Sequence, residues 1–417
     1  MTNRSNVPCR SIGPRVVGAV AALVLLAACA GGGNSKTSST TLPITSHGPV
    51  IDGGDRFSVE LTAAGRVLAW GHNSTGELGD GTEVLRPTPA PVRGLPAGLR
   101  IVSVSAGANH VLALGADGSV WAWGHNRSGQ LGDGSKVDRP APIRVKGLHD
   151  ARAVSAGNAF SVALEADGSV FAWGNNQSGQ LGDGNAPEDH ITPELVHGLG
   201  KGSGVVQIAS GKSHILVRKS DGSLFGWGNG TSGQLGDGAN TKKSAPGPVI
   251  GLGPNSGVIS IAAGGSHSLA LKADGTVFAW GNNKSGQLGN GTRPADQNRP
   301  VSVKGLSRGS GVIAIAAGAS FSVALERDGT VVTWGKNKVG ELGNGTTRDS
   351  SVPVKITSRG SGPVPTAVAT GAYHALALRD DGTVIAWGDN SSGQLGSGAV
   401  STDSTEPVAA TASKSTP

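Results

Sequence analysis

One short segment of this 417-residue chain contains residues that could bind phosphate. Ala209–Ser213 (ASGKS) resembles the end of a phosphate-binding loop, in which a glycine-rich turn before a helix cradles phosphate with its backbone N–H groups. However, Val206 stands where the first glycine of such a loop is needed, and no helical pattern follows. The segment also aligns with Ser105–Asn109 in an internal repeat. We therefore predict a turn between two strands and no nucleotide site.

A second segment carries side chains that metal ions accept. It contains Glu188, Asp189, His190, Glu194 and His197. Their spacing matches neither a zinc nor a calcium pattern, so we expect a solvated polar loop.

Four histidines share one position of the internal repeat, and phenylalanine replaces them in three copies. The histidines are His110, His214, His267 and His374, and the phenylalanines are Phe57, Phe160 and Phe321. A metal site would not accept phenylalanine at a ligand position, so we predict a ring of buried packing residues. Trp121, where other copies have Leu, Phe, Val or Ile, is also predicted to be a packing residue. The motifs H-E-x-x-H and G-x-S-x-G are absent, and we predict no catalytic residue, no metal and no cofactor.

The N-terminus has the pattern of an export signal. Polar residues with Arg4, Arg10 and Arg15 precede an apolar run over Val16–Ala28. Thirteen apolar residues are too few to span a bilayer, which needs roughly 20, and they are typical of a signal peptide. The run ends in Leu-Ala-Ala-Cys at Cys29, which resembles the lipobox of bacterial lipoproteins. We predict a signal peptide over residues 1–28 and a lipid on Cys29, with an ordinary signal peptide as the alternative.

Cysteine usage agrees with a lipid anchor. Cys9 and Cys29 are the only cysteines, and Cys9 would leave with the signal peptide, so the fold cannot depend on a disulfide. Residues 29–48 are rich in Gly, Ser and Thr and are predicted to be a flexible tether. Residues 411–417 are predicted to be a disordered tail. The anchor would attach the chain to a membrane without crossing it.

The region between these ends contains seven copies of one unit. The dipeptide Trp-Gly has its Trp at 70, 123, 173, 227, 280, 334 and 387, with spacings of 50 to 54 residues. The second copy reads AGANHVLALGADGSVWAWGHNRSGQLGDG. In it, HVLAL predicts a strand, Asp117-Gly118 a tight hairpin with both residues at positive φ, and VWAW a strand that is covered on both faces. A strand with proline, such as Pro142–Val145, is predicted to close each unit at a sheet edge.

About four short strands per copy and seven copies predict an all-β, seven-bladed β-propeller over residues 49–410. The last copy has its own closing strand at Pro407-Val408. Leu42–Thr45 is the alternative partner at that edge.

The repeated pattern G-x-x-H-x-x-A-L-x-x-D-G-x-V-x-x-W-G-x-N-x-x-G-Q-L-G resembles the repeat of the regulator of chromosome condensation family. The resemblance covers nearly the whole predicted mature chain and implies a seven-bladed β-propeller. The family's eukaryotic namesake exchanges nucleotide on a small GTPase through a wedge-like insertion in one blade. The even spacing of the seven copies leaves no room for such an insertion here.

Charge and composition limit the partners. Removal of the leader lowers the net charge from +6 to +3, which is too small for a general nucleic-acid binder. The long connecting loops contain many Lys and Arg residues and no aromatic residue. Arg and Tyr often anchor protein interfaces. The candidate partner-binding residues are Arg93, Arg139, Arg144, Lys242, Lys243, Arg299, Arg308, Arg348, Arg359 and Tyr373.

These observations together predict a non-catalytic binding scaffold of the cell envelope. It would be a monomer, lipid-anchored on the extracytoplasmic face of a membrane, and would bind an envelope or secreted protein and no nucleic acid. Three alternatives remain open. They are a structural lipoprotein that binds wall polymer, a guanine-nucleotide exchange factor by family analogy, and a propeller hydrolase or lyase that uses Asp52 and Asp55 of the first copy.

Overall fold

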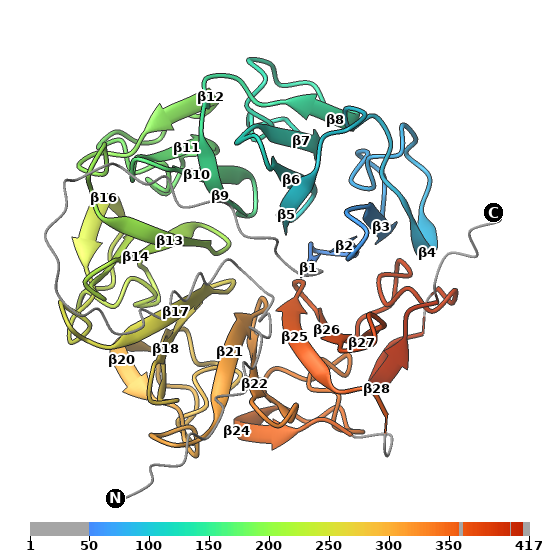
Figure 1. Ribbon diagram of the computed structural model, residues 1–417. Coiled ribbons are helices and arrows are strands. Elements are labelled where there is room, and N and C mark those ends of the chain that lie inside the picture. Colours follow the sequence, from blue (N-terminus) through green and yellow to red (C-terminus); the bar gives the residue numbers. More distant parts are fainter. Residues whose placement is uncertain (1–49, 358–361, 401, 412–417) are drawn as a thin grey trace, which may run out of the picture.

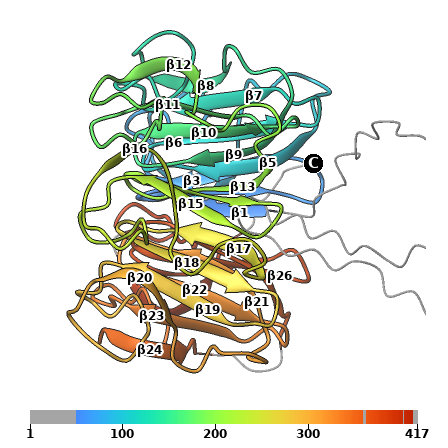
Figure 2. The same ribbon diagram turned by 90° about the vertical axis from the view of Figure 1, so that its left-hand side faces the viewer.

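Seven four-stranded antiparallel sheets surround a central channel in the computed structural model (Figure 1). The structure describes residues 50–357, 362–400 and 402–411. Seen edge-on, the blades form a thick disc with the strands running from one face to the other (Figure 2). The predicted seven-bladed β-propeller is therefore confirmed. Within these ranges, no helix is long and apolar enough to cross a membrane.

Within each blade the four strands follow chain order from the channel outward. The innermost strands are β1 (Val50–Gly53), β5 (Ile101–Ala106), β9 (Ala151–Ala156), β13 (Val205–Ser210), β17 (Val258–Ala263), β21 (Val312–Ala317) and β25 (Pro365–Thr370). The second strands are β2 (Phe57–Leu61), β6 (His110–Gly115), β10 (Phe160–Glu165), β14 (His214–Lys219), β18 (His267–Lys272), β22 (Phe321–Glu326) and β26 (His374–Arg379). The third strands are β3 (Val67–Gly71), β7 (Val120–Gly124), β11 (Val170–Gly174), β15 (Leu224–Gly228), β19 (Val277–Gly281), β23 (Val331–Gly335) and β27 (Val384–Gly388).

The outer strands are the proline-containing edges that the sequence predicts. They are β4 (Arg86–Pro91), β8 (Arg139–Arg144), β12 (His190–Leu195), β16 (Lys243–Pro248), β20 (Gln297–Ser302), β24 (Ser350–Lys355) and β28 (Ser404–Ala409). The strand β28 pairs with β27 and places Val408 opposite Ala386, so the seventh blade is completed by its own chain. The place that the alternative gave to Leu42–Thr45, which lies outside the described residues, is thus occupied by β28.

The predicted hairpin geometry at Asp-Gly is wrong. Gly118 has φ of 79°, but Asp117 does not lie in the left-handed region. The Gly118 N–H donates to the Gly115 carbonyl, and Asp117 Oδ1 accepts from the Ser119 N–H at 2.9 Å. This is a three-residue turn that ends in a left-handed glycine, a common alternative to the two-residue turn. The aspartate is there as a hydrogen-bond acceptor.

The largest side chains of the core lie between blades. All seven repeat tryptophans are fully buried. Each indole Nε1–H donates to the backbone carbonyl of a Gln or Glu in the preceding blade, at 2.8–3.0 Å. In the second and third blades this joins Trp173 to Gln130. A Cβ on the nearby Gly132 would lie 2.8 Å from Trp173 Nε1, so glycine is required there.

The four repeat histidines bind the neighbouring blade, as packing residues with a polar partner. His110 Nε2 lies 2.9 Å from Ser161 Oγ of the next blade, and Ser161 donates its own proton to the Gln130 carbonyl at 2.7 Å. The imidazole must therefore donate from Nε2. The same arrangement recurs in the pairs His214–Ser268, His267–Ser322 and His374–Ser58.

Where phenylalanine replaces the histidine, the facing residue of the next blade is apolar. Phe57, Phe160 and Phe321 share a core cluster with Val111, Ile215 and Ala375, respectively. The seven blade interfaces are thus four His–Ser pairs and three Phe–aliphatic pairs. The mixture of His and Phe along the repeat follows from what the next blade presents, since a buried donor needs a partner.

The first prediction concerns this pairing. His110→Phe with Ser161→Val converts a His–Ser interface into a Phe–aliphatic interface. Ser161→Val alone leaves the imidazole N–H unpaired and should lower the free energy of unfolding by about 1–3 kcal/mol. The double variant should lose less than the sum of the two single variants, as measured by urea unfolding. The matched control is Phe160→His with Ile215→Ser at the next interface. Additive losses in both cycles would contradict the pairing.

The second prediction concerns acid stability. Burial lowers the pKa of His110 to about 3, with a further contribution from the His125 charge. In the unfolded chain His110 is protonated below about pH 6.5, whereas in the folded chain it stays neutral. The contribution of neutral His110 to the free energy of unfolding is therefore full above that pH and is lost as pH falls toward 3. The variant with His110→Phe and Ser161→Val should therefore show a slope of unfolding free energy against pH that is smaller by about 1.4 kcal/mol per pH unit between pH 4 and 6. Equal slopes in the variant and the parent would show that His110 does not resist protonation.

Candidate functional site

The propeller has two different faces. We call the face with the turns between first and second strands and the loops between third and fourth strands the loop face. In the second blade these are Gly107–Asn109 and residues 125–138. The opposite face, which carries the Asp-Gly turns and the crossings between blades, is called the hairpin face. In the second blade its segments are Ala116–Gly118 and residues 145–150.

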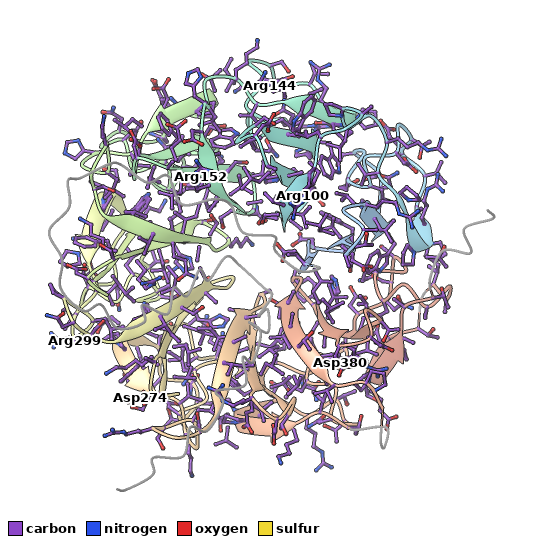
Figure 3. The ribbon with its side chains drawn as sticks, viewed as in Figure 1. Arg100, Arg144, Arg152, Asp274, Arg299 and Asp380 are labelled. Carbon is purple, nitrogen blue, oxygen red and sulfur yellow. The ribbon has the colours of Figure 1, made fainter. Side chains whose placement is uncertain are left out.

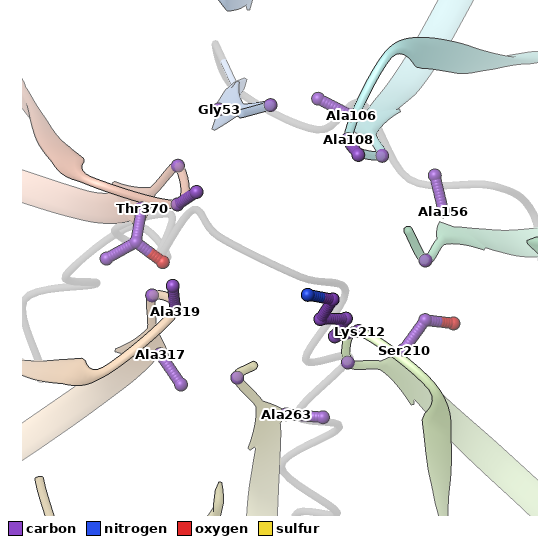
Figure 4. A pocket seen from close by; sticks show the side chains of 18 of the residues that line it. Gly53, Ala106, Ala108, Ala156, Ser210, Lys212, Ala263, Ala317, Ala319 and Thr370 are labelled. Atoms are coloured by element: carbon purple, nitrogen blue, oxygen red, sulfur yellow. The ribbon is translucent and has the colours of Figure 1, made fainter. Parts of the chain in front are cut away.

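The central channel forms a cavity of about 190 Å³ among the described residues. Glycine, alanine and serine make up most of its wall, and its charged residues are Asp52, Asp55 and Lys212. Figure 4 shows Lys212 pointing toward the middle of the channel, with the short side chains of Ala156, Ser210 and Ala317 around the wall. The channel therefore offers few side chains for chemistry.

Asp52 serves the contact between the first two blades. Its Oδ2 accepts from the Ala106 N–H at 2.9 Å and from Ser105 Oγ at 3.3 Å, and its Oδ1 accepts from the Gly53 N–H at 2.9 Å. Burial raises the pKa of Asp52 to about 6. Ser105 and Ser155 occupy the same place in the next two blades and accept from the following blade in the same way.

Asp55 lies at the mouth of the channel on the loop face. Burial raises the pKa of its carboxyl, and the charges of Lys212 and Arg56 oppose this rise. Asp52 and Asp55 are thus both at the channel, as the enzyme alternative requires. The three hydrogen bonds of Asp52 leave its oxygens occupied by the framework.

The other residues singled out by their chemistry are accounted for by the framework. Lys212 is in the turn after β13, where its N–H donates to Gly264 of the next blade, so the predicted turn at Ala209–Ser213 is confirmed. Trp121 is half-buried, and its Nε1–H donates to Ser119 at 3.1 Å. It packs against the core between the first two blades, as predicted.

The polar segment of the third blade is divided between both ends of β12. His190 lies on the loop face and pairs with Asp183 at 3.1 Å, whereas Glu194 and His197 lie toward the hairpin face. Asp189 accepts from the Asn176 N–H. In the described part of the chain, no three His, Cys, Asp or Glu side chains are grouped closely enough to hold a metal ion.

The loops of the loop face are held by an internal asparagine. Asn126 Oδ1 accepts from the Leu131 N–H at 2.9 Å, and Nδ2 donates to the carbonyls of Ser135 and Val137 at 3.1 Å. The asparagines at 73, 176, 283, 337 and 390 make the equivalent bond to the backbone N–H five residues later. These loops are therefore fixed by buried hydrogen bonds, and residues at their tips are presented on a rigid base.

The candidate partner-binding residues do not form one patch. Arg139, Lys242, Lys243, Arg299, Arg348 and Tyr373 lie on the loop face, and Arg93, Arg144 and Arg308 on the hairpin face. Arg359 lies outside the described residues. Figure 3 labels Arg144 and Arg299, which lie on well-separated blades. Arg139 and Lys243 are held by ion pairs within their own loops, with Asp133 at 2.9 Å and Asp237 at 3.5 Å.

Three further exposed lysines lie on the loop face. They are Lys212, Lys284 and Lys338. Most of the candidate residues lie in the long connecting loops, whereas these lysines lie inside the repeated motif. Their signal was a variable motif position: Lys284 and Lys338 each stand four residues after the repeat tryptophan.

A model described as an RCC1-like domain matches residues 32–313, and models of the regulator of chromosome condensation (RCC1) repeat match segments between 312 and 394. The ultraviolet-B receptor UVR8 of Arabidopsis thaliana is 34% identical, over 84% of this chain and 78% of the receptor. The E3 ubiquitin-protein ligase HERC2 of Homo sapiens is 33% identical over 82% of this chain, which spans only 7% of that ligase.

Solved structures agree with these matches. Prp20p of Saccharomyces cerevisiae, described with its binding properties to Gsp1p and histones, superposes with a TM-score of 0.73 and 28% identity over 84% of this chain and 86% of that one. Human WBSCR16 superposes with a TM-score of 0.71 and 28% identity over 83% and 94%. The seven repeated blades and these matches place this chain in the family of RCC1-like domains.

Proposed function

We propose that this chain is a non-catalytic protein-binding scaffold of the cell envelope, attached to the extracytoplasmic face of a membrane through a lipid on Cys29. The observation that carries the binding role is the use of buried polar groups. The indoles, the His–Ser pairs, Asp52 and the loop asparagines all bond to the framework between or within blades. What remains for function is the exposed surface of rigid loops, which suits recognition more than chemistry.

The relatives support a binding role. Prp20p is described by its binding to Gsp1p and histones, and yeast RCC1 (Prp20) has been solved with Kap60 bound to it. A relative that binds other proteins makes protein binding the first expectation for this chain. The identity of those partners is not carried over, because function depends on the loops and not on the fold.

The export signal and the position of Cys29 support the location. An apolar run of 13 residues followed by Leu-Ala-Ala-Cys is suited to signal cleavage before a cysteine that carries lipid. One lipidated residue and a tether of Gly, Ser and Thr would hold the propeller close to a membrane surface.

The third prediction tests the anchor. Metabolic labelling of producing cells with an alkyne fatty acid should label the chain, and Cys29→Ser should abolish the label because the attachment residue is gone. Cys9→Ser is the matched control and should be labelled like the parent, since Cys9 leaves with the signal peptide. Undiminished labelling of the Cys29→Ser variant would refute the anchor.

The fourth prediction tests the binding role. The mature chain, immobilised through its C-terminus, should retain one protein from the envelope or secreted fraction at both low and moderate salt, and excess soluble chain should compete with it. Exposed charge pairs alone weaken as salt rises, so retention at both salts indicates a packed interface. Recovery of wall fragments only, or of nothing that resists salt, would contradict a protein-binding scaffold and favour polymer binding.

A further inference from the structure

The loop face is divided into two halves of opposite charge. We call blades four to six the basic half and blade seven with blades one to three the acidic half, counting their loop-face segments and the first three residues of each outer strand. The basic half has nine Lys and Arg against four Asp and Glu, and the acidic half has five against twelve. The charged residues of the basic half are Lys212, Asp237, Lys242, Lys243, Lys284, Arg293, Asp296, Arg299, Lys336, Lys338, Glu341, Arg348 and Asp349.

The acidic half is made of the residues Asp55, Arg56, Glu77, Asp80, Glu83, Arg86, Arg127, Asp133, Lys136, Asp138, Arg139, Asp183, Glu188, Asp189, Asp389, Asp403 and Glu406. The overall charge of the loop face does not reveal this division, because the net positive charge of the basic half nearly offsets the net negative charge of the acidic half. A charge separation of this kind across one surface produces a field that orients a charged partner.

The cations of the basic half are largely free. Five exposed side chains form no ion pair in the described ranges, and Lys242 contacts only the Gln177 carbonyl at 3.2 Å. The five are Lys212, Lys284, Arg299, Lys338 and Arg348. They come from three consecutive blades, and Lys212 is at the channel mouth (Figure 4). Unpaired, exposed cations on rigid loops can bind the carboxylates of a partner without first breaking ion pairs within this chain.

The carboxylates of the acidic half, in contrast, are mostly used by the loops themselves. Asp133 accepts from Ser135 and pairs with Arg139, and Asp80 makes the same contacts with Thr82 and Arg86. Other carboxylates accept from backbone N–H groups, as Asp403 does from Asn390. Internal donors hold these carboxylates in place, but the acidic half keeps its excess of negative charge, and the excess of unpaired cations lies in the basic half.

One aromatic residue lies at the boundary of the halves. Tyr373 of blade seven is 37% exposed, and the Lys336 ammonium of blade six is 4.9 Å from its ring centroid. Tyrosine and cationic residues together are common anchors in protein interfaces. The basic half therefore has an aromatic contact at its border, on a lysine that also pairs with Glu341 at 3.7 Å.

The negative charge of the acidic half favours a protein partner over an anionic membrane or a long polyanion. An anionic membrane or a long polyanion that covered the loop face would meet the carboxylates of the acidic half as well as the cations of the basic half, and like charges oppose such binding. A folded protein can present carboxylates to one half only. We propose that the loop face binds a protein partner through an acidic patch that lies over blades four to six, next to Tyr373. This inference rests on the proposed binding function and specifies its surface and chemistry.

The fifth prediction uses a defined probe, a fluorescent 16-residue peptide rich in Glu and Asp, with the whole mature chain at low salt. The variant Lys284→Ser, Lys338→Ser, Arg348→Ser should weaken binding of the peptide by about tenfold, because three unpaired cations are lost. The matched control on the hairpin face is Lys201→Ser, Lys272→Ser, Arg308→Ser, which should change the affinity by less than about twofold. All six side chains are at least partly exposed, so both variants should keep the thermal unfolding midpoint of the parent.

A photo-crosslinker on the peptide supplies a second readout that does not depend on folding of a variant. Crosslinks to blades four to six are expected. Equal losses in the two variants, crosslinks spread over both faces, or tighter binding of phosphatidylglycerol vesicles or polyphosphate than of the peptide would overturn the inference. Failure of the peptide while the mature chain still retains an envelope protein would overturn the acidic patch alone. Failure of both would also remove the scaffold proposal.

Discussion

The hydrogen bond from each repeat tryptophan to the preceding blade is the contact on which the ring depends. The buried indole N–H needs an acceptor, and the acceptor is a backbone carbonyl that another blade supplies. In an isolated blade the indole N–H would therefore lack its acceptor, and the apolar ring would lack its packing partners. The same need explains the glycine beside the carbonyl, where any side chain would collide with the indole. Each blade is therefore completed by its neighbours in the ring.

This dependence extends to residues that look variable in the sequence. The carbonyl that accepts a hydrogen bond from the indole also accepts one from a serine hydroxyl in four interfaces, and the serine oxygen in turn accepts one from the imidazole N–H of a histidine. In the other three interfaces no serine faces the ring, and phenylalanine replaces histidine. Histidine and phenylalanine are thus two solutions to one packing problem. Histidine occurs where the next blade presents a serine, and phenylalanine occurs where it presents an aliphatic residue.

The sequence was sufficient for the architecture, because seven evenly spaced copies set the number of blades and alternating turns set the strands. It did not reveal the His–Ser pairs, which join neighbouring blades: three pairs are 51 to 55 positions apart, and His374–Ser58, which closes the ring, is 316 positions apart. Nor did it reveal the sides of the ring. One connecting stretch contributes Arg86 to the loop face and Arg93 to the hairpin face, with an outer strand between them. The candidate partner-binding residues, most of which come from such connecting stretches of sequence, therefore lie on two opposite faces.

The positions of the unpaired cations follow from the same framework. The motif fixes Trp, Gly, Asn and Leu through contacts inside the disc, and it leaves the residue four places after each tryptophan exposed. Ser74, Arg127, Gln177, Lys284 and Lys338 all occupy that place, with the same loop geometry below them. Charge can thus change blade by blade with little effect on stability, because exposed substitutions away from packed features have small effects. A ring built in this way can acquire a charged half on one face while every blade keeps the same fold.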